Sequence, residues 1–389
     1  MKKISIAFFA LLFAICLTCF LPQKEVFAKT SNESTFVLGQ NAVSCVLADG
    51  DTGYIIYQKN ATDKRPIASM TKIMTLLVIY DNINAGKLKL DDEVTVSQTA
   101  AGMGGSQAFL DAQSVHKVGD LIKTIVVASA NDSCVALAEH LYGDVENFVS
   151  EMNKKALQLD LKATNFVNCT GLPALNQYSC AIDCVKMFFA LIHQNNNYFD
   201  YSTIWMDDFQ HPSGRITSLT NTNKLVKFYE GCDGGKTGYT NEAHHCLCAT
   251  AKRGDTRLIA CVLAEPDSKT RFAEVSQMFN YGFANFNTKV YLNKETVIET
   301  KINNGKSKVL EVKPQNNLTA FLKKGETGEE ISVVTEFNKT SAPFYLGETV
   351  GTAFLIKKGE VIAQTPLIST MDVKKKSYFD SIEEIIKQW

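Results

Sequence analysis

Residues 66–80 read PIASMTKIMTLLVIY, a stretch in which a serine and a lysine three positions apart open a long apolar run. The run is apolar on nearly every side and too short to span a bilayer, which predicts a helix buried in a domain core. Pro66 is typical of a chain entering a helix, so Ser69 is expected in the first turn. Ser69 and Lys72 would then share one helical face, with their side-chain heads close together.

This pair has a chemical and a structural interpretation. A serine hydroxyl becomes a strong nucleophile when a base takes its proton, and the neutral amine of Lys72 can be that base. A capping serine followed by a solvated lysine fits the same residues, because Ser-x-x-Lys is a short motif. The rest of the chain decides between the two.

Two further polar clusters follow in order. Ser129-Ala130-Asn131 lies at a tight junction between helices expected over 118–127 and up to residue 141, and Lys236-Thr237-Gly238 lies in a glycine-rich strand. Glycines in a strand usually mark the close approach of a backbone or a ligand, and a lysine there can hold an anionic group. A helix cap, a helix junction and a weakened edge strand could each explain one cluster. All three in this order predict a serine acyl-transfer site.

The composition is that of an ordinary globular protein. The 389 residues suffice for two or three domains, and 45% are hydrophobic and 21% charged. The net charge of -1 gives no excess of positive charge of the kind that indicates nucleic-acid binding.

The amino terminus has the pattern of a secretory signal. Two lysines precede an apolar stretch over 4–21, and residues 26–28 place small side chains as a cleavage site requires. We expect residues 1–28 to be a signal peptide and the body of the protein to be exported. An uncleaved anchor helix is the alternative, because the apolar run is long for a signal.

Nine cysteines remain once Cys16 and Cys19 leave with the signal. Most lie within apolar runs, where a free thiol acts as a small buried hydrophobe, and we favour that state over disulfides. The run 244–248 (His-His-Cys-Leu-Cys) lacks a second ligand pair with zinc spacing, and in a strand Cys246 and Cys248 would face one side. We therefore expect no metal site.

The carboxyl terminus predicts an amphipathic helix over 374–389. After three lysines, apolar residues recur at helical spacing on one face, and acidic and polar residues take the other. The segment is too short to cross a bilayer, which needs about 20 residues. A helix in the membrane surface fits best, with lysines toward anionic headgroups and Trp389 at the interface. A helix docked on the protein's own surface is the alternative.

Strands and helices alternate between these ends. Apolar patterns and turn signals predict, in order, a hairpin over 43–47 and 54–57, a short strand over 91–97 and helices over 145–157 and 180–194. Further strands are expected over 222–228, 236–240, 246–251 and 257–264, then a helix over 274–286. Short alternating segments over 290–370 predict a small all-β domain with no cluster that suggests chemistry.

The three clusters, and the sequence from about residue 35 to the carboxyl end, resemble the low-molecular-weight penicillin-binding proteins, specifically the D-alanyl-D-alanine carboxypeptidase family. The resemblance implies an α/β (α+β) fold, with a β-lactamase/transpeptidase-like antiparallel sheet flanked by helices over 35–287. The all-β domain over 290–370 and the membrane-surface helix over 374–389 would follow. It also implies an envelope protein at the outer face of the cytoplasmic membrane, without a cofactor, whose partners are peptidoglycan stem pentapeptides, β-lactam antibiotics and the membrane surface.

The resemblance assigns catalytic roles position by position. Ser69 would attack the peptide carbonyl between two D-alanines and form an acyl-enzyme. Lys72 would accept its proton, and Ser129 would relay a proton to the leaving amine. Lys72 must be neutral to act, and burial together with the positive charge of Lys236 is expected to lower its pKa.

The substrate-binding residues are assigned in the same way. Asn131 would orient the acyl side, and Lys236 and Thr237 would hold the terminal carboxylate. After Gly238, the backbone N–H of Tyr239, matched by position only, would form the oxyanion hole with that of Ser69. Strand alternation sends Lys236 and Thr237 to opposite faces, so both reach a substrate only if the strand borders the cleft.

Two positions depart from the family's pattern. Ala130 stands where glycine is common, which is a small change. The stretch 179–183 reads Ser-Cys-Ala-Ile-Asp where an arginine commonly precedes the aspartate, so Asp183 lacks that partner. This difference concerns local structure rather than chemistry.

Two other functions remain open. A class A-like β-lactamase shares all three clusters, but its deacylating glutamate lies in a Glu-x-x-Leu-Asn stretch, which does not occur between Asn131 and Lys236. A non-catalytic envelope scaffold that binds peptidoglycan without cutting it would keep the same fold.

Overall fold

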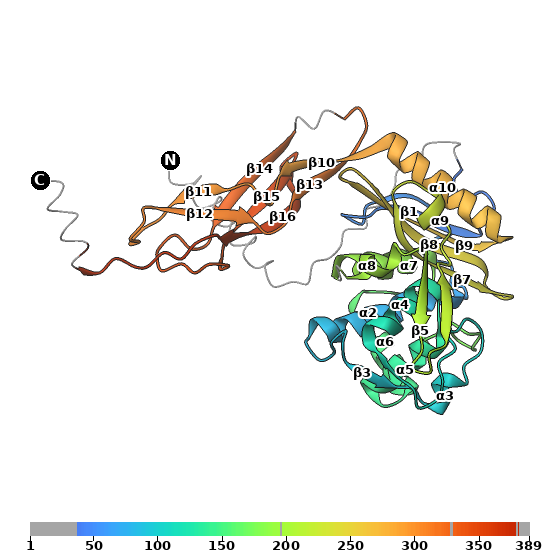
Figure 1. Cartoon of the computed structure of the whole chain (residues 1–389). Helices are drawn as coiled ribbons and strands as arrows, with labels where there is room; N and C mark the ends of the chain where they lie inside the picture. The colour runs from blue at the N-terminus through green and yellow to red at the C-terminus, as the bar shows by residue number, and fades with distance from the viewer. Residues whose placement is uncertain (1–36, 195–196, 327–329, 379, 381–389) are drawn as a thin grey trace, which may run out of the picture.

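A computed structural model describes residues 37–194, 197–326, 330–378 and 380 of the chain (Figure 1). Its first part is organised around a five-stranded antiparallel sheet in the order β2-β1-β9-β8-β7. The strands are β1 (Ser44–Asp49), β2 (Ile55–Lys59), β7 (Cys232–Thr240), β8 (His244–Arg253) and β9 (Thr256–Glu265). Strand β7 forms one edge of this sheet, because only β8 pairs with it among the described strands.

Alternation along these strands divides their side chains between two cores, one on each face of the sheet. On β1, Val46 and Ala48 join the larger core, and Cys45 and Leu47 join the smaller one. The smaller core is covered by α10 (Ser268–Asn285), whose first turn is capped by the Asp267 carboxylate accepting from two backbone N–H groups. The larger core faces α7 (Ala181–Gln194) and the helical part of the domain.

The helical part is inserted between β2 and β7 and lies below the sheet in Figure 1. It begins with a single 3₁₀ turn, η2 (Ala68–Thr71), that continues into α2 (Lys72–Asn84). Its other helices are α3 (Gln98–Ala101), α4 (Val118–Ala128), α5 (Asn131–Tyr142), α6 (Val145–Gln158) and α8 (Tyr198–Ser202). Two small hairpins complete it: β3 (Glu93–Thr95) with β4 (Val115–Lys117), and β5 (Met206–Gln210) with β6 (Ile216–Thr220). The short helix α9 (Leu225–Phe228) precedes β7 and lies on the α10 side of the sheet, where Leu225 joins the smaller core.

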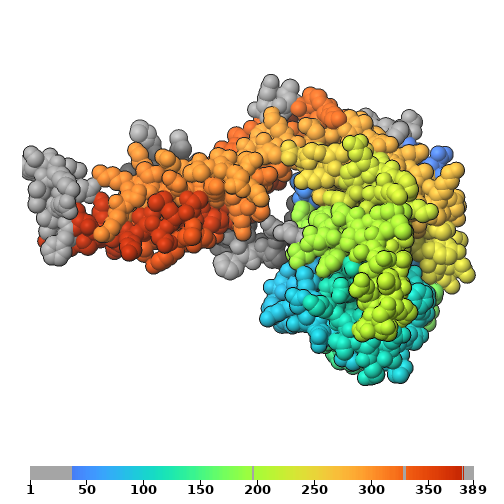
Figure 2. Space-filling view, viewed as in Figure 1, coloured from blue at the N-terminus to red at the C-terminus, as the bar shows by residue number. Residues whose placement is uncertain are grey.

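The second part is all-β and extends from the end of α10 as a narrow arm (Figures 1 and 2). Strand β10 (Phe286–Leu292) pairs with β13 (Leu318–Lys323). The five-stranded sheet has the order β11 (Ile298–Lys301), β12 (Val309–Pro314), β16 (Glu360–Ser369), β15 (Thr349–Lys357), β14 (Ile331–Phe337). Both sheets contribute to one apolar core that includes Leu310, Phe344 and Leu355.

These elements confirm the predicted fold class, a helix-flanked antiparallel sheet followed by an all-β part. The strand expected over 222–228 is wrong. Side chains of two asparagines bond to the backbone there, Asn221 to the N–H of Asn223 and Asn223 to the N–H of Leu225, and a short helix follows. Such local bonds compete with a strand ladder. The hairpin β5–β6 was not expected.

The segments expected to meet a membrane lie largely outside the described residues. This holds for the signal over 1–28 and for most of the terminal helix over 374–389. Within the described part of the chain, no helix combines the length and apolar character needed to cross a bilayer.

The cysteines of the described chain are free thiols, and all nine are buried. Cys246 and Cys248 face the larger core from β8, as strand alternation predicts, while Leu247 between them faces the smaller core. No three His, Cys, Asp or Glu side chains of the described residues come together as a metal-binding group.

Candidate active site

Ser69 and Lys72 lie together where the 3₁₀ turn passes into α2. The Lys72 Nζ is 3.2 Å from the Ser69 Oγ, the contact that three-residue spacing on a helix permits. The helix that carries them is buried on nearly all sides, from Ile73 to Tyr80, which fixes its position in the core. The nucleophile and base candidates are therefore held by a rigid element.

Lys72 is fully buried and makes two further polar contacts. Its Nζ donates to the Asn131 side-chain oxygen at 2.6 Å and to the backbone carbonyl of Thr170 at 2.7 Å. Burial disfavours an ammonium ion, so the pKa of Lys72 is lowered from its ordinary value. The contacts are all to neutral groups, and none of the described residues pairs a carboxylate with this amine.

Asn131 bridges the lysine and the loop across the cleft. Its side-chain amide donates to the carbonyl of Gly104 at 2.7 Å, while its side-chain oxygen accepts from Lys72. The neighbouring Asp132 accepts from the N–H groups of Ala108 and Leu110, which fastens the same loop to the start of α5. The glycine-containing loop is thus held against the site by two consecutive side chains.

Ser129 meets Lys236 on the opposite side. The Lys236 Nζ donates to the Ser129 Oγ at 2.8 Å, joining residues 107 positions apart. Ser129 ends α4 with φ +63°, a left-handed conformation that turns the chain sharply into α5. Burial and then the positive charge of Lys72 lower the pKa of Lys236 well below its ordinary value. The two buried lysines therefore disfavour being charged at the same time.

The strand β7 brings Lys236, Thr237 and Gly238 against the 3₁₀ turn. A Cβ on Gly238 would lie 2.4 Å from the Ile67 carbonyl oxygen, so only glycine permits this approach. Lys236 is directed toward Ser129, and Thr237 is 7% exposed. Because β7 is an edge strand among the described strands, its unpaired side can pack against the 3₁₀ turn that carries Ser69.

Tyr239 follows Gly238 on the same strand. Its ring is exposed and stacks on His245 of β8 with centroids 4.4 Å apart. Its backbone N–H belongs to the peptide group whose carbonyl, that of Gly238, accepts from Arg271 at 3.2 Å. The buried guanidinium also donates to the carbonyl of Cys246, so it fixes the orientation of two adjacent strands at this point.

Three contributions were not expected from the sequence. The Thr170 carbonyl and the Arg271 guanidinium reach the site from segments without a recognised motif. Gly171 packs so closely on the Ala68 carbonyl that a Cβ there would lie 2.0 Å from its oxygen. Backbone carbonyls leave no signal in a sequence, and an arginine on an amphipathic helix is usually solvated. Only the position of α10 shows the contact that Arg271 makes.

The carboxylate of Asp183 forms hydrogen bonds with groups other than an arginine. It accepts from the N–H of Ala163 and from the hydroxyl of Thr164. These bonds satisfy the buried group at the start of α7.

Comparisons with known proteins match both parts of the chain. Residues 29–267 match the family described as D-alanyl-D-alanine carboxypeptidase, and residues 286–375 match the penicillin-binding protein 5 C-terminal domain. The D-alanyl-D-alanine carboxypeptidase DacF of Bacillus subtilis is 38% identical over 381 residues, covering 97% of each chain. DacC of Escherichia coli is 31% identical, covering 97% of this chain and 93% of its own. The crystal structure of penicillin-binding protein 5 from Haemophilus influenzae superimposes with a TM-score of 0.67 at 30% identity, covering 88% of this chain and all of that one.

Proposed function

The chain belongs to the D-alanyl-D-alanine carboxypeptidase family, and on that premise we propose that Ser69 removes the terminal D-alanine from peptidoglycan stem pentapeptides. As a member of this family it is a serine peptidase that acts on peptidoglycan. The observation that carries the assignment of Ser69 is the 3.2 Å contact between its hydroxyl and a fully buried lysine amine. That contact supplies a nucleophile and a base whose neutral form is favoured by its surroundings.

The acylation step begins with proton transfer. Neutral Lys72 takes the hydroxyl proton as the Ser69 oxygen forms a bond to the carbonyl carbon between the two D-alanines. The negative charge on the carbonyl oxygen is stabilised by the backbone N–H groups of Ser69 and Tyr239. The carbon–nitrogen bond then breaks as Ser129 relays to the leaving amine the proton that Lys72 took from Ser69. Free D-alanine departs and Lys72 is neutral again.

Deacylation repeats the chemistry with water. A water molecule attacks the ester carbon, Lys72 accepts its proton, and the ester bond breaks as the proton returns to the Ser69 oxygen. The products are a shortened stem peptide and the original enzyme. Asn131, held between Lys72 and the 104–106 loop, orients the acyl part of the substrate in both steps.

Binding of the terminal carboxylate sets the charge of the two lysines. Lys236 and Thr237 hold this carboxylate, and an anion beside Lys236 raises the pKa of that amine. A charged Lys236 in turn disfavours a charged Lys72, because the two groups interact. Substrate binding therefore favours the state in which Lys236 is an ammonium and Lys72 is a base.

The same serine reacts with β-lactams, whose strained amide presents a carbonyl and a carboxylate in similar positions. A long-lived penicilloyl-enzyme is expected rather than fast turnover. No carboxylate of the described residues bonds to Ser69 or Lys72, and the Glu-x-x-Leu-Asn stretch that carries the deacylating glutamate of class A-like β-lactamases does not occur between Asn131 and Lys236. Both observations favour the carboxypeptidase over the β-lactamase. The site contains the polar groups that the chemistry needs, which favours an enzyme over a non-catalytic scaffold.

The location that suits this activity is the outer face of the cytoplasmic membrane. We propose that residues 1–28 direct export, that 35–287 form the catalytic domain and that 290–370 form a spacer. The lysine-rich helix over 374–389 would lie in the membrane surface. The support is the sequence pattern of the two ends together with the arm-like shape of the all-β part, which extends away from the catalytic sheet (Figure 1).

Release of D-alanine from a pentapeptide tests the proposal. Wild-type protein should release one D-alanine per peptide, and Ser69→Ala should release none while keeping its melting temperature. A fluorescent penicillin should label the wild type and not the variant. Absence of both the label and D-alanine release would favour the scaffold, and rapid loss of the label would favour the β-lactamase.

A further inference from the structure

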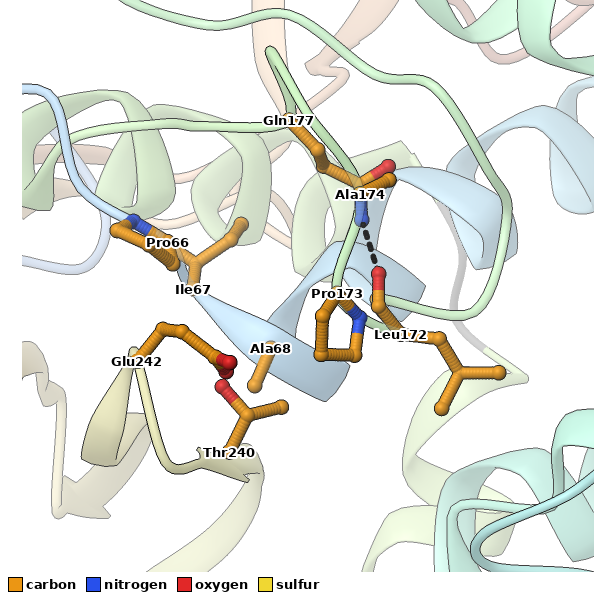
Figure 3. Close-up of a pocket in the computed structure, with 10 residues that line it drawn as sticks. Pro66, Ile67, Ala68, Leu172, Pro173, Ala174, Gln177, Thr240 and Glu242 are labelled. Carbon is orange, nitrogen blue, oxygen red and sulfur yellow. Dashed lines mark hydrogen bonds between the residues drawn. The ribbon is translucent and has the colours of Figure 1, made fainter.

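A pocket of about 80 Å³ opens beside the nucleophile turn (Figure 3). Ala68, the residue before Ser69, and Gly171, the residue after Thr170, both line it. On one side it is bounded by Thr240 and Glu242, and on the other by Leu172 and Pro173 (Figure 3). None of the roles described above uses this pocket.

Strand geometry places the pocket at one end of the cleft. Thr240 has the same facing on β7 as Gly238 and Lys236, because side chains alternate along a strand. At about 3.3 Å per residue, Thr240 lies about 13 Å beyond Lys236, with Gly238 between them at the level of the 3₁₀ turn. The pocket and the Lys236 amine therefore lie on opposite sides of Ser69.

The direction of a bound peptide follows from the proposed function, on which this inference rests. The terminal carboxylate lies by Lys236 and Thr237, and the scissile carbonyl lies between the N–H groups of Ser69 and Tyr239. A peptide extended along the free edge of β7 then continues toward Thr240. The residue before the acyl D-alanine reaches the level of the pocket, because each extended residue adds about 3.3 Å.

The lining of the pocket combines an apolar wall and one carboxylate. Pro66, Leu172, Pro173 and Ala174 contribute apolar surface, and Glu242 is the only charged residue among the ten that line the pocket. Glu242 is exposed, and no donor from the described residues bonds to its carboxylate. An aliphatic stem ending in an ammonium matches these two features, since such chains lay their methylenes on apolar surface and keep the charge at the tip.

We propose that this pocket is a specificity site for a diamino acid at the position preceding the acyl D-alanine, with the side-chain ammonium paired to Glu242. The cleft then has a cation, Lys236, at the end that receives the carboxylate and an anion at the end that receives the amine. A stem peptide with a free amine at this position is bound in one direction by both ends. A peptide whose amine is acylated loses the ion pair at Glu242.

The test compares two substrates that differ only in this charge. Nα-acetyl-L-lysyl-D-alanyl-D-alanine has a free side-chain amine, and the Nα,Nε-diacetyl peptide does not. Wild-type protein should release D-alanine from the free-amine peptide with a kcat/KM about two- to fivefold higher, the upper part of the range expected for an exposed ion pair. Glu242→Gln should bring this ratio to about one. Asp255→Asn, an exposed change in the turn between β8 and β9, should leave the ratio as in the wild type.

The outcomes separate this inference from the proposed function. Equal kcat/KM for the two peptides in the wild type, or an unchanged preference in Glu242→Gln, overturns the inference and leaves the carboxypeptidase assignment intact. Absence of D-alanine release from both peptides contradicts the proposed function instead. In that case calorimetric binding of the two peptides to Ser69→Ala decides the inference. A tighter Kd for the free amine that Glu242→Gln abolishes supports it, and equal Kd values or no binding overturn it.

Discussion

Replacement of Lys72 by arginine separates the role of the amine as a base from its role as a cation. The lysine amine is 3.2 Å from the Ser69 hydroxyl and fully buried, and burial lowers its pKa. An ordinary lysine, with a pKa near 10.4, is neutral in only about one molecule in a thousand at pH 7.4. A guanidinium has a pKa above about 12 and stays charged, so it cannot take the serine proton.

The expected loss follows from the step that is removed. General-base catalysis contributes about 10²- to 10⁴-fold, or about 3–5 kcal/mol of transition-state stabilisation at 1.36 kcal/mol per tenfold. The second-order rate of acylation by penicillin should therefore fall by this factor in Lys72→Arg at pH values above the pKa of Lys72, and by less at lower pH, where the lysine of the wild type is also charged. In the wild type the rate should rise with pH as Lys72 loses its proton, and it should level off below the pKa of an ordinary lysine, because burial lowers the pKa of Lys72.

The assay is stopped-flow acylation by a fluorescent penicillin between pH 5 and 10.5. Thr75→Val is the matched control, because it removes a buried bond from the same helix, to the Cys169 carbonyl, without touching the amine. Thermal melts show whether each variant keeps the fold. A wild-type rate that still rises near pH 10.4, or a folded Lys72→Arg protein that acylates within threefold of the wild type, would refute the assignment of Lys72 as base.

Three further outcomes follow from the structure. Lys236→Gln removes the cation expected to hold the terminal carboxylate, so kcat/KM should fall about 10- to 100-fold for D-alanyl-D-alanine peptides. For a peptide that ends in D-alaninamide, which has no terminal carboxylate, the fall should be much smaller. An equal fall for both peptides would argue against carboxylate binding by Lys236. Gly238→Ala places a Cβ 2.4 Å from the Ile67 carbonyl oxygen and should move β7 away from the 3₁₀ turn. Penicillin acylation should therefore fall at least about 100-fold while the circular dichroism spectrum is retained. An acylation rate close to that of the wild type would mean that the 3₁₀ turn shifts to accommodate the methyl group and the site keeps its geometry. Burial, and then the neighbouring Glu274, raise the pKa of Glu265 from 4.5 to about 9, with smaller influences from Lys59 and Asp267. A carboxyl pKa that is higher in the folded than in the unfolded protein contributes stability below the unfolded-state pKa, and this stability is lost as the pH rises to about 9. Glu265→Gln should therefore have the same free energy of unfolding as the wild type near pH 4.5 and a higher one, by about 2–5 kcal/mol, at pH 9. Urea melts at the two pH values measure this difference, and a difference independent of pH would contradict the raised pKa.

The sequence predicted the elements whose patterns are long or repeated. The buried helix after Ser69, the helices on either side of Ser129 and the three strands from 232 to 265 all occur, with boundaries that differ by a few residues. Each of these segments contains at least one full period of its apolar pattern, and such a pattern places all of its apolar residues on one face only in a helix or only in a strand. The all-β part was predicted from its turn signals, and it begins directly at the end of α10.

The segment 222–228 shows why short patterns fail. Its apolar residues fit a strand or a single helical turn equally well, and the outcome was decided by two asparagine side chains bonding to nearby N–H groups. The 206–220 hairpin was overlooked for a related reason. Phe209 is the one buried residue of β5, and Leu219 is the one buried residue of β6. With so few buried side chains, the apolar pattern of these strands is weak.

The contacts of the candidate site likewise differ in how far the sequence predicts them. The proximity of Ser69 and Lys72 follows from helical spacing alone. The contacts of Lys72 with Asn131 and of Lys236 with Ser129 join residues 59 and 107 positions apart, so they depend on the packing of separate elements. The Thr170 carbonyl and the Arg271 guanidinium could not be foreseen, because a backbone oxygen has no residue signature and the direction of a long side chain is set by the tertiary fold.

Peptide mapping of the penicillin adduct is the measurement that tests the central claim most directly. After brief exposure to benzylpenicillin, intact mass spectrometry of the wild type should show one added penicillin, and proteolysis should locate it on Ser69. Ser69→Ala should gain no mass under the same conditions. An adduct on another residue, or an adduct that persists in Ser69→Ala, would show that the hydroxyl beside the buried lysine is not the nucleophile.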